Sequence, residues 1–367
     1  MTDKIKLKMM RVVKLAFLAL FLITSSAVFA EDHGKADDHH APAKKEFNAG
    51  ETIIHHIVDS YYWHILDWGD HAVSVPLPVI LIDEGKLITF SSAKFHHGHD
   101  PYKGFEIAHS GPNKGKIIKH GPNHEEILPL DFSITKNVVA IFVSLTIMLI
   151  IFISVAKAYK KREGKAPKGL QSFMEPLILF IRDDIAKASI GKKKYAKYTP
   201  YLLTAFFFIF LNNLMGLIPF IPGGANVTGS ISVTLVLALF TFIITTISGN
   251  KNYWAHIFNT PGVPWWLKLP VPLMPVVELI GVFTKPFVLM VRLFANIAAG
   301  HIIVLGFISL IFIFGNIGLV QGYSVSILSV SFAVFMGLLE LLVAFIQAYV
   351  FTLLSAIYIG MAVEEHH

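Results

Sequence analysis

Two long apolar stretches near the C-terminus constrain the fold more than any other feature of the chain. Residues 275–314 and 323–363 each read as one helix of about 40 residues, joined by a glycine-rich turn at 315–322. At about 1.5 Å per residue, each helix would be roughly 60 Å long, whereas the hydrocarbon core of a bilayer is about 30 Å thick. Because both stretches are apolar along most of their length, we expect a strongly tilted hairpin inside the membrane. Such a hairpin needs a large curved membrane partner to lean on.

The composition agrees with a membrane protein. Of the 367 residues, 54% are hydrophobic and 15% are charged, against about 25% charged residues in soluble domains. The chain has no cysteine, which excludes disulfides, thiolate nucleophiles and cysteine metal sites. The net charge of +6 is concentrated in short loops, so it indicates membrane topology rather than binding to nucleic acid. No phosphate-binding loop of the GxxxxGK[ST] type is present, and we expect no nucleotide chemistry in this chain.

The N-terminal third predicts an exported, extramembrane segment. Residues 1–30 read as a signal peptide, with a basic start, a short apolar core and small residues up to Ala30; an uncleaved anchor is the alternative. Residues 31–130 then form a periplasmic N-terminal extension, in which we expect an amphipathic helix over 51–68 and a β-hairpin over 77–91. The extension holds most of the histidines. They lack the spacing of a known metal site, so we interpret them as solvated side chains.

Residues 131–367 predict the membrane domain. Three spans are expected at 138–156, 200–218 and 230–248, in addition to the two long helices. The basic loop 157–168 lies inside by the positive-inside rule, and 169–191 is too charged to span, which favours an interfacial helix or a shallow hairpin. The predicted fold is therefore an all-α polytopic membrane protein with about five transmembrane helices and an interfacial helix. Its mature N-terminus lies in the periplasm and its C-terminus in the cytoplasm.

Sparse polar residues form a pattern on the first long helix. Glu278, Lys285, Arg292 and Asn296 follow one another at steps of seven, seven and four, which places them on one helix face. An arginine at the centre of a membrane helix costs roughly 2.5 to 3.5 kcal/mol on insertion scales. Its guanidinium also stays protonated at any realistic pH. Arg292 is therefore a candidate functional residue whose anion comes from another subunit.

Polar residues of the second long helix fall at matching levels. In an antiparallel hairpin with a turn near residue 318, Gln347 lies opposite Arg292, and Glu340 lies opposite His301. One reading of these residues is structural, as hydrogen bonds that hold the two helices together. The other reading is functional, as a polar path for ions. Arg292 favours this reading, because the nearest acid on the hairpin, Glu340, lies about two turns away and does not neutralise it.

These segments resemble subunit a of F-type ATP synthases. The similarity is carried by "ELIGVFTKPFVLMVRLFANIAAGH" and "ELLVAFIQAYVFTLLSAIYIGMAVEEH", with support from "GLQSFMEPLILFIRDDIAK" and "FFFIFLNNLMGLIPF". It covers about residues 130–367 and leaves 31–129 unexplained. The resemblance implies a subunit that is non-catalytic alone and needs no cofactor. The implied partners are a ring of c subunits, the b-subunit peripheral stalk and the remaining synthase subunits in a bacterial inner membrane.

The resemblance also implies roles for individual residues. Arg292 would be the stator cation that meets the ring carboxylates between two aqueous half-channels. The residues implied for the outer half-channel and ring interface are Asn296, His301, Glu340 and Gln347. Those implied for the cytoplasmic half-channel are Glu278, Thr284 and Lys285.

The sequence departs from the pattern of many family members in two ways. The acid and the histidine are exchanged between His301 and Glu340, and Gly216 stands where some members carry an acid.

Two other functional classes remain as alternatives. A stand-alone ion channel or transporter predicts internal repeats or broken helices, which the sequence does not show. A purely structural scaffold leaves Arg292 without a reason.

Overall fold

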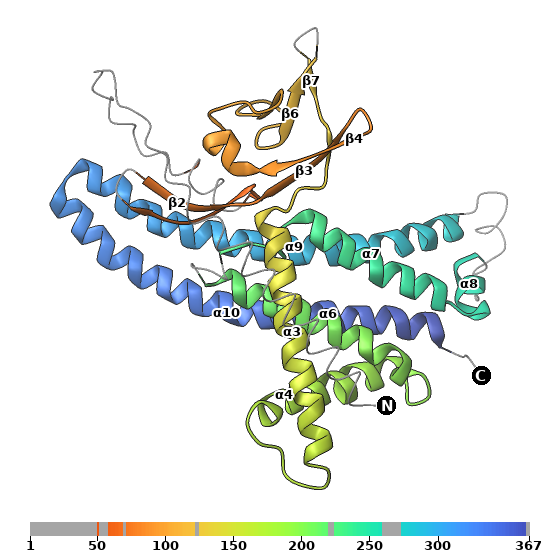
Figure 1. The fold of residues 1–367 in the computed structure, drawn as a ribbon. Helices are drawn as coiled ribbons and strands as arrows, with labels where there is room; N and C mark the ends of the chain where they lie inside the picture. Colours follow the sequence, from red (N-terminus) through yellow and green to blue (C-terminus); the bar gives the residue numbers. More distant parts are fainter. Residues whose placement is uncertain are drawn as a thin grey trace, which may run out of the picture. The chain divides into compact units, whose positions relative to one another are not determined.

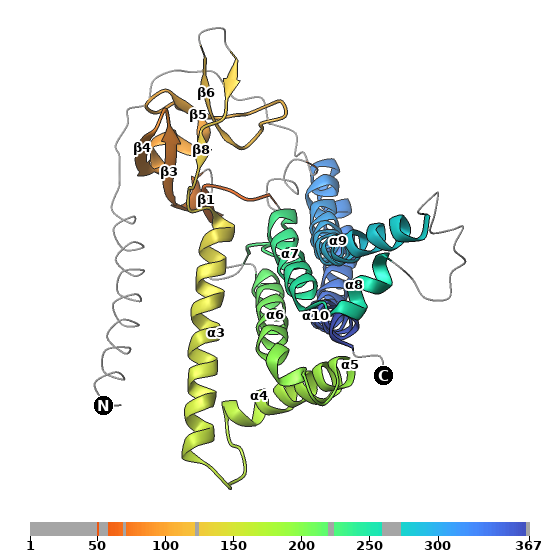
Figure 2. The same ribbon diagram turned by 90° about the vertical axis from the view of Figure 1, so that its right-hand side faces the viewer.

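The computed structural model describes Gly50 and residues 58–68, 71–121, 125–218, 224–258 and 273–364. The predicted signal peptide lies outside the described residues. The chain divides into two units. The β unit comprises Met1–Glu46 and Ser60–Lys136, and the membrane unit comprises Phe47–Asp59 and Asn137–His367. Figures 1 and 2 show the strands of the β unit in orange and the helices of the membrane unit from yellow to blue.

The β unit consists of three small antiparallel sheets around one core. The first sheet pairs β1 (Tyr62–Trp68) with β2 (His71–Pro76). The second has the order β4 (Lys86–Ser91), β3 (Pro78–Asp83) and β8 (Leu130–Asp131), and the third has the order β5 (Phe105–Ile107), β6 (Ile117–His120) and β7 (Glu126–Ile127). Buried residues of the core include Val79, Leu81, Phe95, Phe105 and Ile117.

The predicted β-hairpin over 77–91 is confirmed. Strands β3 and β4 pair with Asp83 opposite Lys86, so the connection is the two residues Glu84 and Gly85. Both have positive φ, 50° and 78°, which is the conformation that a two-residue turn of type I′ requires. The hairpin therefore follows from local turn chemistry and from the alternation of apolar residues in the two strands.

The amphipathic helix predicted over 51–68 is wrong for its second part. Residues 62–68 form strand β1, whereas 51–57 lie outside the described residues. Trp63 is buried and the residues on either side of it are only partly buried, which is the period of two expected for a strand. The aromatic residues of this stretch favour a strand, and pairing with β2 supplies the backbone hydrogen bonds that the sequence could not reveal.

A 3-10 segment, η1 (Ser92–Gly98), carries an unusual pair of histidines. His96 and His97 both have positive φ, 42° and 59°. The His97 ring stacks on Tyr62 with centroids 4.6 Å apart, and the His97 backbone N–H donates to the Tyr62 hydroxyl at 3.1 Å. Desolvation against this surface lowers the pKa of His97, and the nearby charges of His99, His64 and His96 lower it further.

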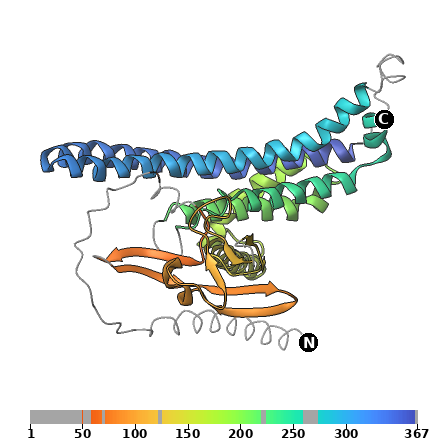
Figure 3. The ribbon, with the colours of Figure 1, turned by 90° about the horizontal axis from the view of Figure 1, so that it is seen from above.

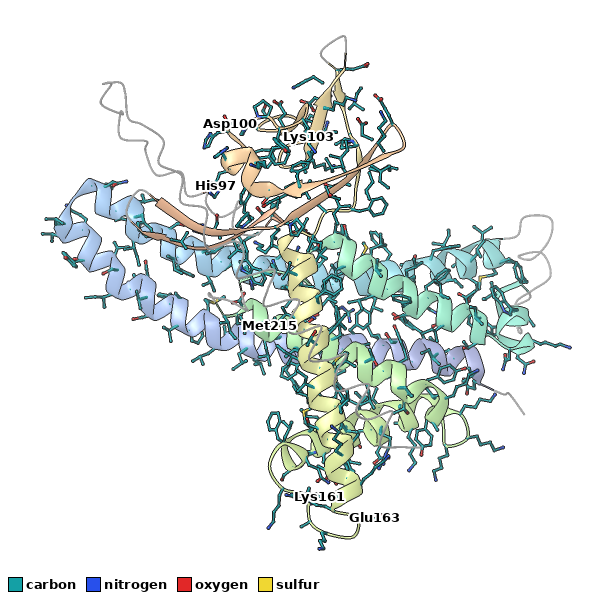
Figure 4. All side chains as sticks on the ribbon, viewed as in Figure 1. His97, Asp100, Lys103, Lys161, Glu163 and Met215 are labelled. Atoms are coloured by element: carbon teal, nitrogen blue, oxygen red, sulfur yellow. The ribbon has the colours of Figure 1, made fainter. Side chains whose placement is uncertain are left out.

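The membrane unit contains the five helices long and apolar enough to span a bilayer that are found in the described part of the chain. They are α3 (Lys136–Lys161), α6 (Tyr195–Gly216), α7 (Ile231–Ser248), α9 (Leu273–Ile317) and α10 (Leu319–Val363). The predicted number and order of the spans are thus confirmed. In Figure 4, Lys161 and Glu163 mark the tip where α3 ends, and Met215 lies in the last turn of α6.

The charged segment 169–191 is helical and is not a hairpin. Helix α4 (Leu170–Leu179) continues into the π-helical stretch η2 (Phe180–Lys187) and into α5 (Ala188–Ile190). Its buried side chains, Ile181 and Ile185, join the core formed by α6, α9 and α10. The chain approaches α10 very closely here, since a Cβ at Gly360 would collide with the Ser189 carbonyl oxygen.

Helices α9 and α10 have 45 residues each and form the predicted hairpin. They run side by side from the turn over most of their length, the N-terminal end of α9 turns away from α10, and both helices cross the direction of α3 instead of lying along it (Figures 1 and 3). The turn is shorter than the predicted 315–322, because Gly318 alone separates the two helices. The other glycines allow close contact, since a Cβ at Gly322 would lie 2.9 Å from the Gly315 Cα. Helix α8 (Lys251–Phe258) precedes the hairpin.

Candidate functional site

His301 and Glu340 form a direct pair across the hairpin, as their sequence positions predict. His301 Nδ1 lies 2.8 Å from Glu340 Oε1. The two side chains are 17% and 12% exposed, respectively. In a membrane such a pair satisfies both polar groups at once, whereas either group alone would lack a partner. The pair thus places an acid and a base at one level of the α9–α10 seam.

Two glycines shape the space around this pair. A Cβ at Gly300 would lie 2.5 Å from Glu340 Oε1, so the carboxylate rests directly on the backbone of α9. Gly216, at the end of α6, faces the other partner, because a Cβ there would lie 3.6 Å from His301 Nε2. An acidic side chain at position 216 would therefore point at this histidine. Sequence reasoning did not single out Gly300, since a glycine's close contacts are invisible without the fold.

A cluster of buried polar side chains extends from the His301–Glu340 pair toward α6. The Asn213 side chain donates to the Ala344 carbonyl at 3.2 Å, one helical turn beyond Glu340. The Thr228 hydroxyl donates to the Asn213 side-chain oxygen, and both residues are buried. The sequence signal for this group was the pair of asparagines at 212–213 in an apolar helix, which the sequence analysis did not use.

Arg292 lies on the outer surface of the hairpin and is exposed. In the part of the chain that the structure describes, no carboxylate lies within ion-pair distance of it. Asn296 is also exposed on α9, whereas Gln347 is buried on α10 at 7% exposure. Arg292 and Gln347 are predicted to lie opposite each other, but the described residues show no hydrogen bond between their side chains.

The remaining residues predicted on α9 lie nearer its N-terminal end. Thr284 is exposed and donates to the Ile280 carbonyl at 2.8 Å, while Glu278 and Lys285 are half-buried. The four polar residues predicted on one face thus do not share one environment. The reason is that α7 and α8 pack against α9, whereas the surface around Arg292 stays uncovered.

Lys285 lies in a pocket between α7, α9 and α10. Its Nζ sits 5.7 Å from the centre of the Tyr358 ring. The pocket is lined by Thr241, Phe242, Thr245, Thr246, Tyr253, Val282, Lys285, Pro286 and Tyr358. The sequence analysis missed its α7 and α10 residues, because spacing along one helix does not show which face of a neighbouring helix it meets.

Among the described residues, no group of three or more histidine, aspartate or glutamate side chains is placed to hold a metal ion. The described site instead combines a buried acid–base pair with an exposed, unpaired cation on a long apolar hairpin. These features define a polytopic integral membrane protein with polar groups inside its membrane helices.

Comparison with known proteins gives the family. The family described as ATP synthase A chain matches residues 138–360. A second family, described as a domain of unknown function, matches residues 52–132. The chain is 43% identical to the ATP synthase subunit a of Chlorobium phaeobacteroides (strain DSM 266) over 74% of this chain and 82% of the relative. It is 38% identical to the ATP synthase subunit a 2 of Prosthecochloris aestuarii over 95% of this chain and 91% of the relative.

A relative from Chloroherpeton thalassium, also an ATP synthase subunit a, is 46% identical over 66% of this chain and 70% of its own length. The chain therefore belongs to the ATP synthase subunit a family. As such it is a non-catalytic integral membrane subunit that associates with other ATP synthase subunits. The similarity over 95% of the chain also extends into the β unit, which the resemblance found from sequence had left unexplained.

Proposed function

We propose that the chain is the ion-translocating stator subunit of an F-type ATP synthase and works against a ring of c subunits. The observation that carries this proposal is the position of Arg292. It is exposed on the hairpin and has no acidic partner among the described residues. A permanent cation in a membrane needs an anion, and a ring of membrane-buried carboxylates supplies one at each step of rotation.

The surface beside Arg292 suits the close approach of another helix. Ala295 and Ala299 are exposed one and two turns along α9, next to Asn296. Small side chains let the backbones of membrane helices approach each other closely. Exposed apolar residues such as Val288 and Val291 continue this surface. A ring helix on this surface would bring its carboxylate within reach of the guanidinium.

The proposed mechanism follows from the cost of charge in lipid. An ionised carboxylate cannot cheaply face the hydrocarbon, so each ring carboxylate must be protonated before it rotates away from Arg292. Protons enter through an outer half-channel, where the His301–Glu340 pair holds and passes them. The other residues proposed for this half-channel and the ring interface are Asn296 and Gln347.

The cytoplasmic half-channel releases the proton after rotation. It is proposed to involve Glu278, Thr284 and Lys285, which lie between Arg292 and the N-terminal end of α9. Arg292 separates the two half-channels, and its charge repels a proton that would otherwise pass directly from one to the other. Flow of protons is thereby coupled to rotation.

The proposed setting is a bacterial inner membrane. The β unit and the tip of the hairpin at Gly318 lie in the periplasm, and the basic loop 157–168 and the C-terminus lie in the cytoplasm. The basic loop supports this orientation through the positive-inside rule. The b-subunit peripheral stalk is the proposed partner that keeps the subunit from turning with the ring.

Substitution of Arg292 tests the proposal. Arg292→Ala complexes should assemble but lose ion-driven ATP synthesis. Arg292→Lys should be severely impaired, because a compact ammonium lacks the planar fork and loses its proton more readily when buried. The matched control is Arg182→Ala, which removes an exposed arginine that is ion-paired with Asp183 at 2.7 Å and should retain most activity. Normal ATP synthesis by assembled Arg292→Ala complexes would refute the proposal.

A further inference from the structure

The pocket around Lys285 contains two hydroxyl groups that the described residues leave without a hydrogen-bond partner. The side-chain oxygens of Thr245 and Thr246 are buried, and neither has a hydrogen-bond partner among the residues that the structure describes. Thr245 is 8% exposed. A buried hydroxyl without a partner loses its hydration and receives nothing in return, which destabilises the fold.

These two threonines differ from the others in the described membrane helices. Each of the others donates its hydroxyl to the carbonyl oxygen four residues earlier, which is the usual way to satisfy this group in a membrane helix. They are Thr146, Thr199, Thr204, Thr234, Thr241, Thr284 and Thr352. Thr245 and Thr246 give up this bond, and both line the pocket.

The pocket has the chemistry and the room for water. It offers about 10 Å³ for the centre of a water molecule, close to the minimum that one water needs. The polar residues around it are Thr241, Thr245, Thr246, Tyr253, Lys285 and Tyr358. A buried water needs two to four polar partners, and the polar residues that line the pocket supply that number.

The position of the pocket connects it to the proposed exit. Thr246 lies two residues before the end of α7 at Ser248, and Tyr253 lies on the following helix, α8. A water there is thus close to the point where the chain leaves the membrane on the proposed cytoplasmic side. On the other side of the pocket, Lys285 lies seven residues, or about two turns, from Arg292 on α9.

We propose that Thr245 and Thr246 hold water in this pocket and form the α7 wall of the cytoplasmic half-channel. The inference rests on the proposed function. A water bound there accepts a proton on one side and releases another toward the cytoplasm. Each hydroxyl accepts one hydrogen bond and donates another, so both threonines are unchanged after the proton has passed.

Single cysteines test whether the pocket is wet. The chain has no native cysteine, so Thr245→Cys and Thr246→Cys each introduce the single cysteine of this subunit, and the assembled synthase with the unchanged chain gives the background from cysteines of other subunits. In inverted membrane vesicles, Ag⁺ should react with both cysteines and inhibit ATP-driven proton pumping. Ile243→Cys is the matched control, because Ile243 lies on α7 at nearly the same depth and is 41% exposed on the outer surface of the unit. It should stay insensitive.

Removal of the hydroxyls tests whether the water lies on the path. The double variant Thr245→Val, Thr246→Val keeps the side-chain shape and should slow proton-driven ATP synthesis about fivefold, the equivalent of one lost hydrogen bond. The double serine variant keeps both hydroxyls and should restore the rate at equal complex levels.

Three results would overturn the inference. The first is that neither cysteine reacts with Ag⁺. The second is that the cysteines react but the valine variant transports protons at the normal rate, and the third is that the valine and serine variants lose equal activity. Each of these leaves the proposed function standing as long as Arg292→Ala abolishes synthesis. Failure of the Arg292 test would instead remove the proposed function itself.

Discussion

Replacement of Gly300 by alanine should separate the acid from the base without removing either of them. The added methyl group would lie 2.5 Å from Glu340 Oε1, and 3.0 Å and 3.1 Å from its Cγ and Cδ. Ordinary contact begins near 3.4 Å, so the carboxylate must move by about 0.9 Å. The helix itself gains from the change, since alanine is the better helix former by roughly 0.5–1 kcal/mol.

The expected loss follows from the hydrogen bond between the pair. His301 Nδ1 and Glu340 Oε1 are 2.8 Å apart, and the forced shift carries the oxygen to the limit of hydrogen bonding. A hydrogen bond that involves a charged group contributes about 1.5–3 kcal/mol. Its loss corresponds to roughly a tenfold to hundredfold fall in the paired population. If the pair passes protons, transport should fall by at least about tenfold.

The assay is proton-driven ATP synthesis in membranes with matched levels of assembled synthase. Gly315→Ala is the control, because Gly315 lies on the same helix, away from the face of Arg292, and a Cβ there meets nothing within 4 Å. It should retain full activity. Equal activity of the two variants would show that the contact between Gly300 and Glu340 does not limit transport, and the role given to the pair would then be wrong.

Three further predictions address the pair, the β unit and the topology. His301→Glu and Glu340→His should each impair ATP synthesis, and the double exchange should recover a substantial part of it; a double variant no better than the worse single one would mean that the two residues share no path. Because the pKa of folded His97 lies below 6.5, the unfolded chain binds more protons, so the β unit should lose stability as the pH falls below 6.5. Hydrogen exchange of residues 92–98 should show this loss, and His97→Gln should remove that part of it. A cysteine at Gly318 should react with impermeant reagents from the periplasm and one at Glu364 only from the cytoplasm; the reverse pattern would refute the topology.

The membrane fold could be predicted from sequence because its main determinant is local. A span needs only a long apolar run, and each predicted span matches a helix in the structure. The His301–Glu340 contact could also be predicted, since an antiparallel hairpin fixes which residues share a level. Strand β1 could not be predicted in the same way, because its pairing with β2 competes with an apparent helical period. The sequence also predicted a longer turn, over 315–322, than the single residue Gly318. The reason is that glycines which allow close contact between helices look the same in a sequence as glycines of a loop.

The parts of the site that escaped prediction all depend on the rotation of one helix against another. Asn213 on α6 reaches the α9–α10 seam only because that face of α6 turns toward it. The same holds for Thr245 and Thr246 on α7, which meet Lys285 across the pocket. Spacing within one helix gives the depth of each residue along the helix and its angle around the helix axis. It does not show on which side a neighbouring helix packs. Hydroxyl groups that could bond to their own helix and do not are the signal that only the structure provides.

The placement of charge also favours a stator over a stand-alone channel. A channel or transporter formed by this chain alone would turn its intramembrane ionisable residues inward, toward a pathway between its own helices. The His301–Glu340 pair does face inward, between α9 and α10. Arg292 does not, since it is exposed on the same helix about nine residues away. At roughly 2.5 to 3.5 kcal/mol or more, an arginine left facing lipid is a standing cost. A partner that brings a carboxylate to this surface removes that cost, and it explains why the inward pair and the outward cation occur together on one hairpin.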